Sequence, residues 1–308
     1  MTIVVAGHTG LVGSAVYKLL LSQGESVIGI NTSVLNLEDE IETLNFFHEV
    51  KPQVVIDAAA LVGGIIANST YPVEFLIKNL KVQNNLMNAS HAVSVERFIF
   101  LGSSCIYPRD CEQPIREEYL MTGPLESSNS AYAIAKIAGI ELVRSYRREY
   151  GHHWISLMPT NTYGPNDNFN VESAHVLPSL INKFVTAADE GIKKVELWGT
   201  GMAKREFIHS DDLASAIVLC LEKYDHDLHL NLGSGQEFAI SDLANLVSNS
   251  AGYEGEILWD PSKPDGTPRK SLDISRLLDL GWQPKVEFGE GLRMTIDWFR
   301  QNRDKARL

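Results

Sequence analysis

Three regularly spaced glycines, Gly7, Gly10 and Gly13, constrain this 308-residue chain more than any other feature of its sequence. They follow an apolar run at residues 2–6 and precede a segment at 14–23 whose apolar residues recur at helical spacing. Glycines at such a junction let a pyrophosphate approach the backbone, and the helix N-terminus adds free N–H groups. A purely structural turn is the alternative. The position favours a dinucleotide-binding loop, which we predict to consist of Gly7, Thr9, Gly10, Leu11, Val12 and Gly13.

The first half of the chain alternates short apolar runs with amphipathic segments. We predict strands at 2–6, 26–30, 54–56, 97–101 and 154–158, and helices at 14–23, 38–50, 72–91 and 130–150. This alternation is typical of an α/β fold with a doubly wound parallel sheet of the Rossmann type, whose two faces are covered by helices.

The second half is less regular. A polar run rich in Asn, Gly and Pro predicts a loop at 161–174, followed by helices at 176–189, 211–223, 240–252, 274–280 and 290–302 and short strands at 195–198, 229–231 and 256–258. We expect a dinucleotide-binding domain at 1–165, completed by about 204–232. Residues 166–203 and 233–308 are expected to form a smaller mixed α/β substrate lobe.

Composition limits the partners of the chain. With 27 Lys and Arg against 39 Asp and Glu, the formal net charge of −12 disfavours binding to nucleic acid or an anionic membrane. No apolar stretch approaches the roughly 18–20 residues of a membrane span, and the first residues resemble a strand rather than a signal peptide. The three cysteines, Cys105, Cys111 and Cys220, predict no disulfide framework, no metal site and a cytoplasmic location.

The end of the second predicted strand bears on the choice of cofactor. An Asp or Glu at this position binds the ribose hydroxyls of NAD and repels a 2′-phosphate. The chain has neither, whereas Asn31, Thr32 and Ser33 can donate hydrogen bonds to a phosphate. We therefore expect NADP(H).

Tyr132 and Lys136 lie four residues apart and share one face of the predicted helix 130–150. An ammonium beside a phenol favours the phenolate, so we expect the pKa of Tyr132 to be lowered. Ser103 follows the fourth strand, at the edge where ligands of doubly wound sheets bind. The combination predicts a carbonyl–alcohol interconversion. Ser103, with Ser104 able to share its role, would bind the carbonyl oxygen, Tyr132 would protonate it, and Lys136 would tune Tyr132 and hold the nicotinamide ribose.

Cys105 and His175 are further candidates. Each alone has an ordinary explanation, because free Cys is often a small buried filler and His suits the start of a helix. Together they offer an acid and a base for proton exchange next to a carbonyl. The sequence leaves open whether they converge.

Five runs carry a resemblance to a known family: LGSSCIYP at 101–108, EEYLMTGPL at 117–125, AYAIAKIAG at 131–139, MPTNTYGPNDNF at 158–169 and KPDGTPRK at 263–270. From Thr2 to about Arg300 the chain resembles the GDP-L-fucose synthase family, within the extended short-chain dehydrogenases. The resemblance implies NADPH-dependent epimerisation of GDP-4-keto-6-deoxy-D-mannose at C3 and C5, followed by reduction at C4 to GDP-L-fucose.

The resemblance also implies roles for individual residues. Ser103, Tyr132 and Lys136 match the reductive residues of the family, and Cys105 and His175 match its epimerase acid/base pair. Contacts to the GDP-sugar fall on Asn161, Lys183, Trp198, Arg205 and Lys270. Two positions depart from the family, which often has Arg at Thr9 and at Lys183. Lys183 keeps the charge but loses the bidentate fork of Arg.

Three alternatives remain open at this point. The nearest is a 4-reductase, with or without epimerisation, of a related GDP-keto-deoxy-sugar. A sugar 4-epimerase or dehydratase is disfavoured by the Cys105/His175 pair, and a non-catalytic dinucleotide-binding protein by the presence of all three reductive residues. The resemblance further implies a homodimer formed through helices 72–91 and 130–150.

The net charge of −12 is compatible with these anionic ligands only if positive charge is concentrated where they bind. The candidates are the N-terminus of the first helix together with Lys136, Lys183, Arg205, Arg269 and Lys270.

Overall fold

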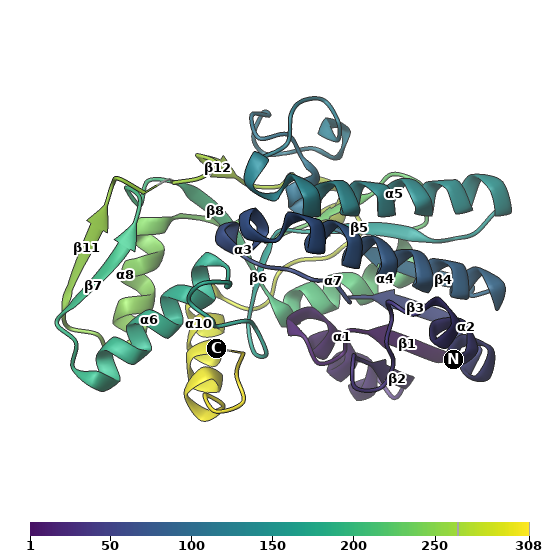
Figure 1. Ribbon diagram of the computed structural model, residues 1–308, viewed down its shortest axis with the longest axis horizontal. Helices are drawn as coiled ribbons and strands as arrows, with labels where there is room; N and C mark the ends of the chain where they lie inside the picture. Colours follow the sequence, from purple (N-terminus) through teal and green to yellow (C-terminus); the bar gives the residue numbers. More distant parts are fainter. Residues whose placement is uncertain (264, 308) are drawn as a thin grey trace.

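A six-stranded sheet forms the larger part of the molecule, shown in Figure 1 as a computed structural model that describes residues 1–263 and 265–307. The strand order is β2-β1-β3-β4-β5-β9, and all neighbouring strands are parallel. The strands are β1 (Thr2–Ala6), β2 (Ser26–Ile30), β3 (Val54–Asp57), β4 (Arg97–Leu101), β5 (Ile155–Pro159) and β9 (Leu230–Leu232). The order reverses at β1, which confirms the predicted doubly wound α/β sheet.

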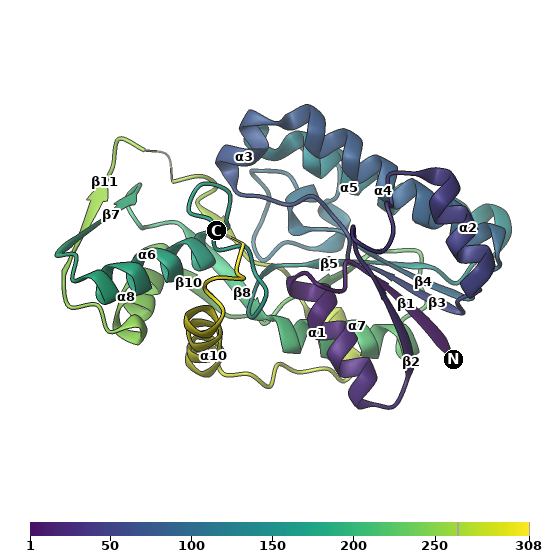
Figure 2. The same ribbon diagram turned by 60° about the horizontal axis from the view of Figure 1, so that its bottom comes forward.

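Helices cover both faces of this sheet (Figure 2). Ile3 and Val5 of β1 face a core shared with α1 (Leu11–Ser22) and α7 (Ser210–Lys223). Val4 and Ala6 face the opposite core, to which α2 (Glu40–Val50), α4 (Pro72–Ala92) and α5 (Ser130–Tyr150) contribute. Because successive strand residues point to opposite faces, a strand buried on both sides is apolar on both, as residues 3–6 of β1 are.

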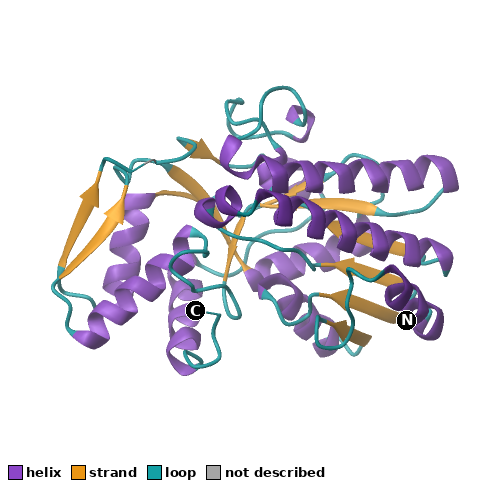
Figure 3. Ribbon diagram, viewed as in Figure 1, coloured by secondary structure: helices purple, strands orange, loops and turns teal. Residues whose placement is uncertain are grey.

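The remaining elements form smaller sheets and a third core (Figure 3). In one sheet β8 (Lys204–His209) pairs with β6 (Asn161–Tyr163), β10 (Glu237–Ala239) and β12 (Arg269–Lys270). The other sheet pairs β7 (Lys194–Trp198) with β11 (Glu256–Asp260). Helices α6 (Val176–Glu190), α8 (Ile240–Ala251) and α10 (Phe288–Gln301) supply the third core, while α3 (Ile65–Thr70) and α9 (Ser275–Asp279) are short. Within segment 204–232, β8 belongs to a small sheet, β9 is a strand of the large sheet, and α7 packs against the large sheet.

Most predicted bounds differ from the structure by one or two residues, and two differ more for identifiable reasons. Helix α1 begins at Leu11 rather than at residue 14, because Gly10 takes the extended N-cap conformation and the helix starts directly after it. The predicted loop 161–174 opens with strand β6, since Asn161 pairs in register with Phe207 of β8, a partner 46 residues away in sequence that local composition does not reveal. Pro264, within the KPDGTPRK run, and Leu308, at the end of the expected substrate lobe, lie outside the described residues.

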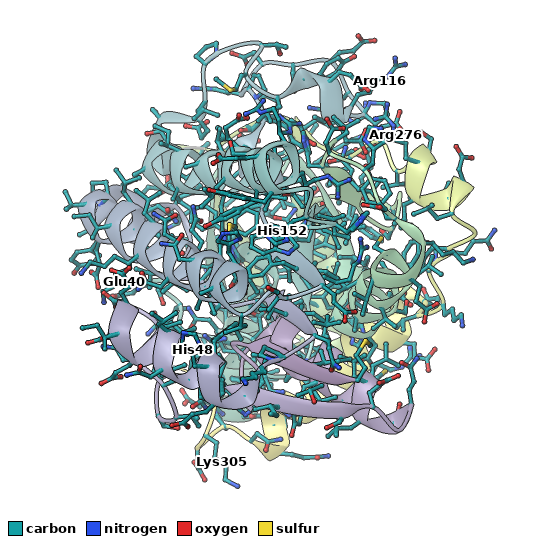
Figure 4. All side chains as sticks on the ribbon, turned by 90° about the vertical axis from the view of Figure 1, so that its right-hand side faces the viewer. Glu40, His48, Arg116, His152, Arg276 and Lys305 are labelled. Carbon is teal, nitrogen blue, oxygen red and sulfur yellow. The ribbon has the colours of Figure 1, made fainter. Side chains whose placement is uncertain are left out.

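Polar contacts hold the segment between β4 and α5 against the rest of the chain. Arg276 pairs with both Glu117 and Glu118, and the Tyr107 hydroxyl donates to Asn231 of β9. Figure 4 shows Arg276 beside Arg116, on the side of the molecule away from α2. These contacts fix the segment whose first residues include Ser103 and Cys105.

Within residues 1–263 and 265–307, none of the helices is long and apolar enough to cross a membrane. The same residues contain no group of three or more His, Cys, Asp and Glu side chains that fits a metal ion.

Candidate active site

The loop between β1 and α1 is shaped by contacts that only glycine allows. Gly7 has a φ of +78° and donates its N–H to the Ile30 carbonyl at 2.8 Å. A Cβ on Gly13 would lie 2.1 Å from the Gly7 carbonyl oxygen. Gly10 has no side chain with which to cap α1, so the first N–H groups of the helix, including those of Leu11 and Val12, are available to an anion. The loop therefore has the backbone geometry required to hold a pyrophosphate.

The residues after β2 form a compact polar turn. The Asn31 side-chain oxygen accepts hydrogen bonds from the Ser33 N–H at 3.0 Å and from the Ser33 hydroxyl at 2.7 Å. These bonds occupy the Asn31 oxygen, so its NH₂ group is the part of the side chain that can donate to a ligand. Thr9, which lies in the neighbouring loop, is exposed. None of these residues carries a negative charge that would repel a phosphate.

Lys136 is a buried residue in the N-terminal half of α5. Its ammonium donates to the Leu101 carbonyl at 2.9 Å and lies 4.8 Å from the centre of the Phe100 ring and 6.0 Å from that of Tyr132. Burial lowers the pKa of Lys136, and the nearby carboxylate of Asp57 opposes this effect. The helical spacing thus places Tyr132 and Lys136 at the end of β4, as the sequence pattern predicts.

Tyr132 does not have the lowered pKa that we expected. Burial raises its pKa, the charges of Cys105 and Asp57 act in the same direction, and a hydrogen bond with Ser103 partly opposes them. The prediction was wrong because the cost of a buried phenolate outweighs the effect that lowers this pKa, which comes from Ser103. Tyr132 is therefore a phenol at neutral pH, which suits a proton donor. The Ser103 hydroxyl also accepts from the Cys105 N–H at 3.2 Å.

Lys270 lies beside Cys105, and its charge acts on His175. Its ammonium lies 3.5 Å from the Cys105 sulfur, which also accepts from the Asn129 amide at 3.3 Å. His175 is the N-cap residue of α6 and is exposed at the surface of the chain. Protein atoms that displace water from the ring, and then the charge of Lys270, lower the pKa of His175. Lys270 thus donates to the thiol and, through its charge, disfavours protonation of the imidazole.

Arg205 lies on β8, and Trp198 is the last residue of β7. The Arg205 guanidinium donates to the Lys204 carbonyl at 2.8 Å, and its cross-strand neighbour in β12 is Lys270. Burial lowers the pKa of Arg205, while Cys105 and Asp265 favour its charged form. Trp198 is 51% exposed, and the Lys263 ammonium lies 5.5 Å from its ring centre.

Three other polar residues predicted for this region have partners of their own. The Asn161 amide donates to the Glu206 carbonyl at 2.8 Å, and the Lys183 ammonium donates to the Glu196 carbonyl at 3.2 Å. Burial lowers the pKa of Lys183 and Glu196 opposes it. Arg269 was expected among the cations of the site, but its guanidinium pairs with Glu237 at 2.8 Å, across β8. Its charge is therefore already compensated.

Sequence reasoning missed three polar residues of this region. Asp57 is the last residue of β3 and is buried, and Asn129 directly precedes α5. Asp265 accepts hydrogen bonds from the Thr200 N–H and hydroxyl, both at 2.7 Å, and favours the charged form of Arg205. Asp57 had a detectable signal, because it is a lone acid that ends an apolar strand at the edge where ligands bind.

Comparison with known proteins gives consistent matches. Residues 3–233 match the model of the NAD dependent epimerase/dehydratase family. GDP-L-fucose synthase 1 of Arabidopsis thaliana is 50% identical over 301 residues, which cover 97% of this chain and 93% of the relative. Among solved structures, a GDP-L-fucose synthetase from Naegleria fowleri bound to NADP is 30% identical, with a TM-score of 0.91 and 100% and 96% coverage. A GDP-6-OMe-4-keto-L-xylo-heptose reductase from C. jejuni is 32% identical, with a TM-score of 0.92 and 98% coverage of both chains.

The position of Lys270 leads to a prediction about His175. Removal of the positive charge by Lys270→Met makes protonation of the imidazole easier, so the pKa of His175 should rise. The His175 ring signals can be titrated by NMR in a histidine-labelled protein and assigned with a His175→Asn variant. Lys263→Met, which removes a cation beside Trp198, is the matched control and should leave the midpoint unchanged. An unchanged midpoint in Lys270→Met would show that Lys270 does not act on His175.

Proposed function

The chain belongs to the NAD dependent epimerase/dehydratase family and, within it, to the GDP-L-fucose synthases, and from this premise we propose that it converts GDP-4-keto-6-deoxy-D-mannose and NADPH into GDP-L-fucose and NADP. One observation supports this proposal above the others. Lys270 donates to the Cys105 sulfur and its charge acts on His175, while Ser103, two residues before Cys105, acts on the pKa of Tyr132 through a hydrogen bond. The chain thus carries groups for proton exchange next to those for reduction.

Proton exchange is the first phase of the proposed reaction. The 4-keto group acidifies the hydrogens on C3 and C5 of the sugar, so a base on one face and an acid on the other invert each carbon. Cys105 and His175 supply these two groups, and the lowered pKa of His175 keeps its imidazole neutral and able to accept a proton. Lys270 and Asn129 orient the sulfur through the hydrogen bonds that they donate to it.

Reduction at C4 is the second phase. NADPH supplies the hydride when it is bound. Ser103 donates a hydrogen bond to the keto oxygen, and Tyr132 delivers the proton that converts it into a hydroxyl. Because burial raises the pKa of Tyr132, the phenol keeps this proton until the oxygen becomes basic. Lys136 holds a positive charge behind Tyr132 and would also hold the nicotinamide ribose of the bound cofactor.

The cofactor loop fits NADPH. The close approach of Gly13 to Gly7 brings the N-terminus of α1 to the pyrophosphate site, and Gly10 leaves its first N–H groups unobstructed. Asn31 and Ser33 follow β2, where an acid would reject the 2′-phosphate. Both Ser33 donors hold the Asn31 oxygen in place, which leaves the Asn31 NH₂ group to donate to the phosphate. The relative from Naegleria fowleri is described as bound to NADP, which supports the same choice here.

Binding of the GDP moiety is assigned to the substrate lobe. Arg205 and Lys183 are half-buried cations suited to the diphosphate, and the exposed face of Trp198 is suited to stacking on a base. Asn161 and Lys270 complete the proposed set at the sugar end. Asp265, which was not foreseen, holds the loop beside Arg205 through Thr200.

A second candidate is reduction without epimerisation, on a related GDP-keto-deoxy-sugar. The 32% identity to a C. jejuni protein described as a GDP-6-OMe-4-keto-L-xylo-heptose reductase supports it. The presence of both Cys105 and His175, and the 50% identity to a plant GDP-L-fucose synthase, favour the full reaction.

We place the chain in the cytoplasm as a homodimer. The three cysteines are free, which suits a reducing compartment. Val73, Ile77 and Ile134 expose apolar side chains on α4 and α5, helices that lie side by side along the outside of the sheet (Figures 1 and 2). The proposed dimer buries these side chains against the same helices of a second copy.

The reaction is tested by mixing the purified chain with GDP-4-keto-6-deoxy-D-mannose and NADPH. Absorbance at 340 nm should fall until one NADPH has been consumed per sugar, and NMR of the product should show inversion at C3 and C5. The rate should be higher with NADPH than with NADH because no acid follows β2. No oxidation of either cofactor would refute the proposal, and a product reduced at C4 without inversion would establish the second candidate.

The dimer is tested by sedimentation of the wild type and of Ile77→Lys. The wild type should sediment with the mass of two chains, and the substitution should shift it toward one, because a charge on the buried face opposes association. A wild type that sediments as a single chain at micromolar concentration would contradict the proposal.

A further inference from the structure

Asp57 is a buried carboxylate that none of the proposed steps uses. It is 1% exposed, and one of its oxygens accepts the Ala59 N–H at 3.1 Å. The other oxygen, Oδ2, has no hydrogen-bond partner in the part of the chain that the structure describes. A buried carboxylate with a free oxygen is costly unless an opposite charge lies nearby.

Strand register determines the direction in which Asp57 points. Its partners across the sheet are Ala6 in β1 and Phe100 in β4. Both belong to the core on the face covered by α2, α4 and α5. Since paired residues of neighbouring parallel strands point to the same face, the Asp57 side chain also points toward α5.

Lys136 reaches that face from α5. Its ammonium lies 4.8 Å from the centre of the Phe100 ring, the side chain directly beside Asp57 in the sheet. The ammonium donates to the Leu101 carbonyl, a neutral group that cannot balance its charge. The charges of Asp57 and Lys136 act on each other, and each favours the ionised form of the other.

Among the described residues, Lys136 is the cation whose charge acts on Asp57, and no second cation competes with it. Besides Lys136, the titratable group of α5 that faces it is Tyr132. Of the charged residues of α4, Glu74 and Lys81 are exposed, and the half-buried Lys78 pairs with Glu74 rather than with Asp57. Ala6 and Phe100, on the flanking strands, carry no charge.

We infer that Asp57 is the buried counter-charge of Lys136 and a positioning residue for the reduction, because it keeps Lys136 an ammonium in a site from which water is largely excluded. The pairing stands on geometry, whereas its role in catalysis rests on the proposed function. Burial raises the pKa of Asp57 to about 6, so the carboxylate is ionised at neutral pH and becomes neutral in mild acid. The attraction is therefore present above about pH 6 and lost below it.

A double-mutant cycle tests the pairing without any substrate. Thermal unfolding is measured for the wild type, Asp57→Asn, Lys136→Met and the double variant, at pH 8 and at pH 5. At pH 8 Lys136→Met should lower the unfolding midpoint of the wild type by about 5 °C or more, because it leaves a buried carboxylate without an opposite charge. In the Asp57→Asn background the same substitution should lower the midpoint by less than about half of that. At pH 5 Asp57 is protonated, so the coupling should disappear. Lys136→Gln replaces Lys136→Met if the latter does not fold.

Asp167 provides the matched control. It is also buried, burial raises its pKa to about 7, and its Oδ2 likewise lacks a hydrogen-bond partner within the described residues, but the charge that acts on it is that of Arg307. Asp167→Asn should show no coupling to Lys136→Met. Coupling of Asp57 no larger than that of Asp167 would overturn the pairing.

The pH dependence of NADPH oxidation tests the catalytic role. In Asp57→Asn the pKa of Lys136 should fall, so the loss of activity at alkaline pH should begin at a lower pH than in the wild type. Asp57→Ser serves if the Asn variant is poorly folded. An alkaline limb that does not move would overturn the positioning role. A wild type that reduces no GDP-keto-sugar would overturn the proposed function instead, while the unfolding cycle would still decide the pairing.

Discussion

The common direction of the six strands in the large sheet is the constraint on which the site depends. Parallel strands end at one edge, so the residues that follow them meet there although they are far apart in sequence. Gly7 follows β1, Asn31 follows β2, Asp57 ends β3, and Ser103 lies just beyond β4. Helix α5 brings Tyr132 and Lys136 back over the same edge. The arrangement is thus a consequence of topology before any single side chain acts.

Burial at this edge of the sheet determines the protonation of its titratable groups. Burial raises the pKa of Tyr132 and lowers that of Lys136, so it opposes charge on both. A phenol that keeps its proton suits delivery of that proton to a reduced carbonyl, whereas a lysine that loses its proton would no longer stabilise the resulting phenolate. The buried carboxylate of Asp57 offsets the second effect.

A chain with a net charge of −12 can bind anionic ligands because a few cations are held in place by backbone carbonyls. Lys183 and Arg205 each donate to a carbonyl oxygen, a neutral group that orients the side chain without cancelling its charge. Arg269 differs, because Glu237 neutralises it. Residue type alone therefore did not separate the cations available to a ligand from those already paired.

Local sequence carried much of the fold and part of the site. The glycine spacing and the alternation of apolar runs predicted the parallel sheet, and the four-residue spacing placed Tyr132 and Lys136 together. Pairing between distant strands could not be predicted, so β6 and β8 were missed. The raised pKa of Tyr132 and the neighbours of Asp57 depend on burial and strand register, which spacing along the chain does not encode.

Proton exchange and reduction are two separable reactions of one proposed site, and deuterium exchange tests this directly. Tyr132→Phe and Cys105→Ser are each incubated in D₂O with GDP-4-keto-6-deoxy-D-mannose and NADPH, and the sugar is followed by NMR. The account predicts that Tyr132→Phe incorporates deuterium at C3 and C5 while NADPH oxidation falls by at least about 10²-fold, and that Cys105→Ser binds NADPH but loses exchange by a similar factor. Wild-type exchange in Cys105→Ser, or wild-type oxidation in Tyr132→Phe, would contradict it.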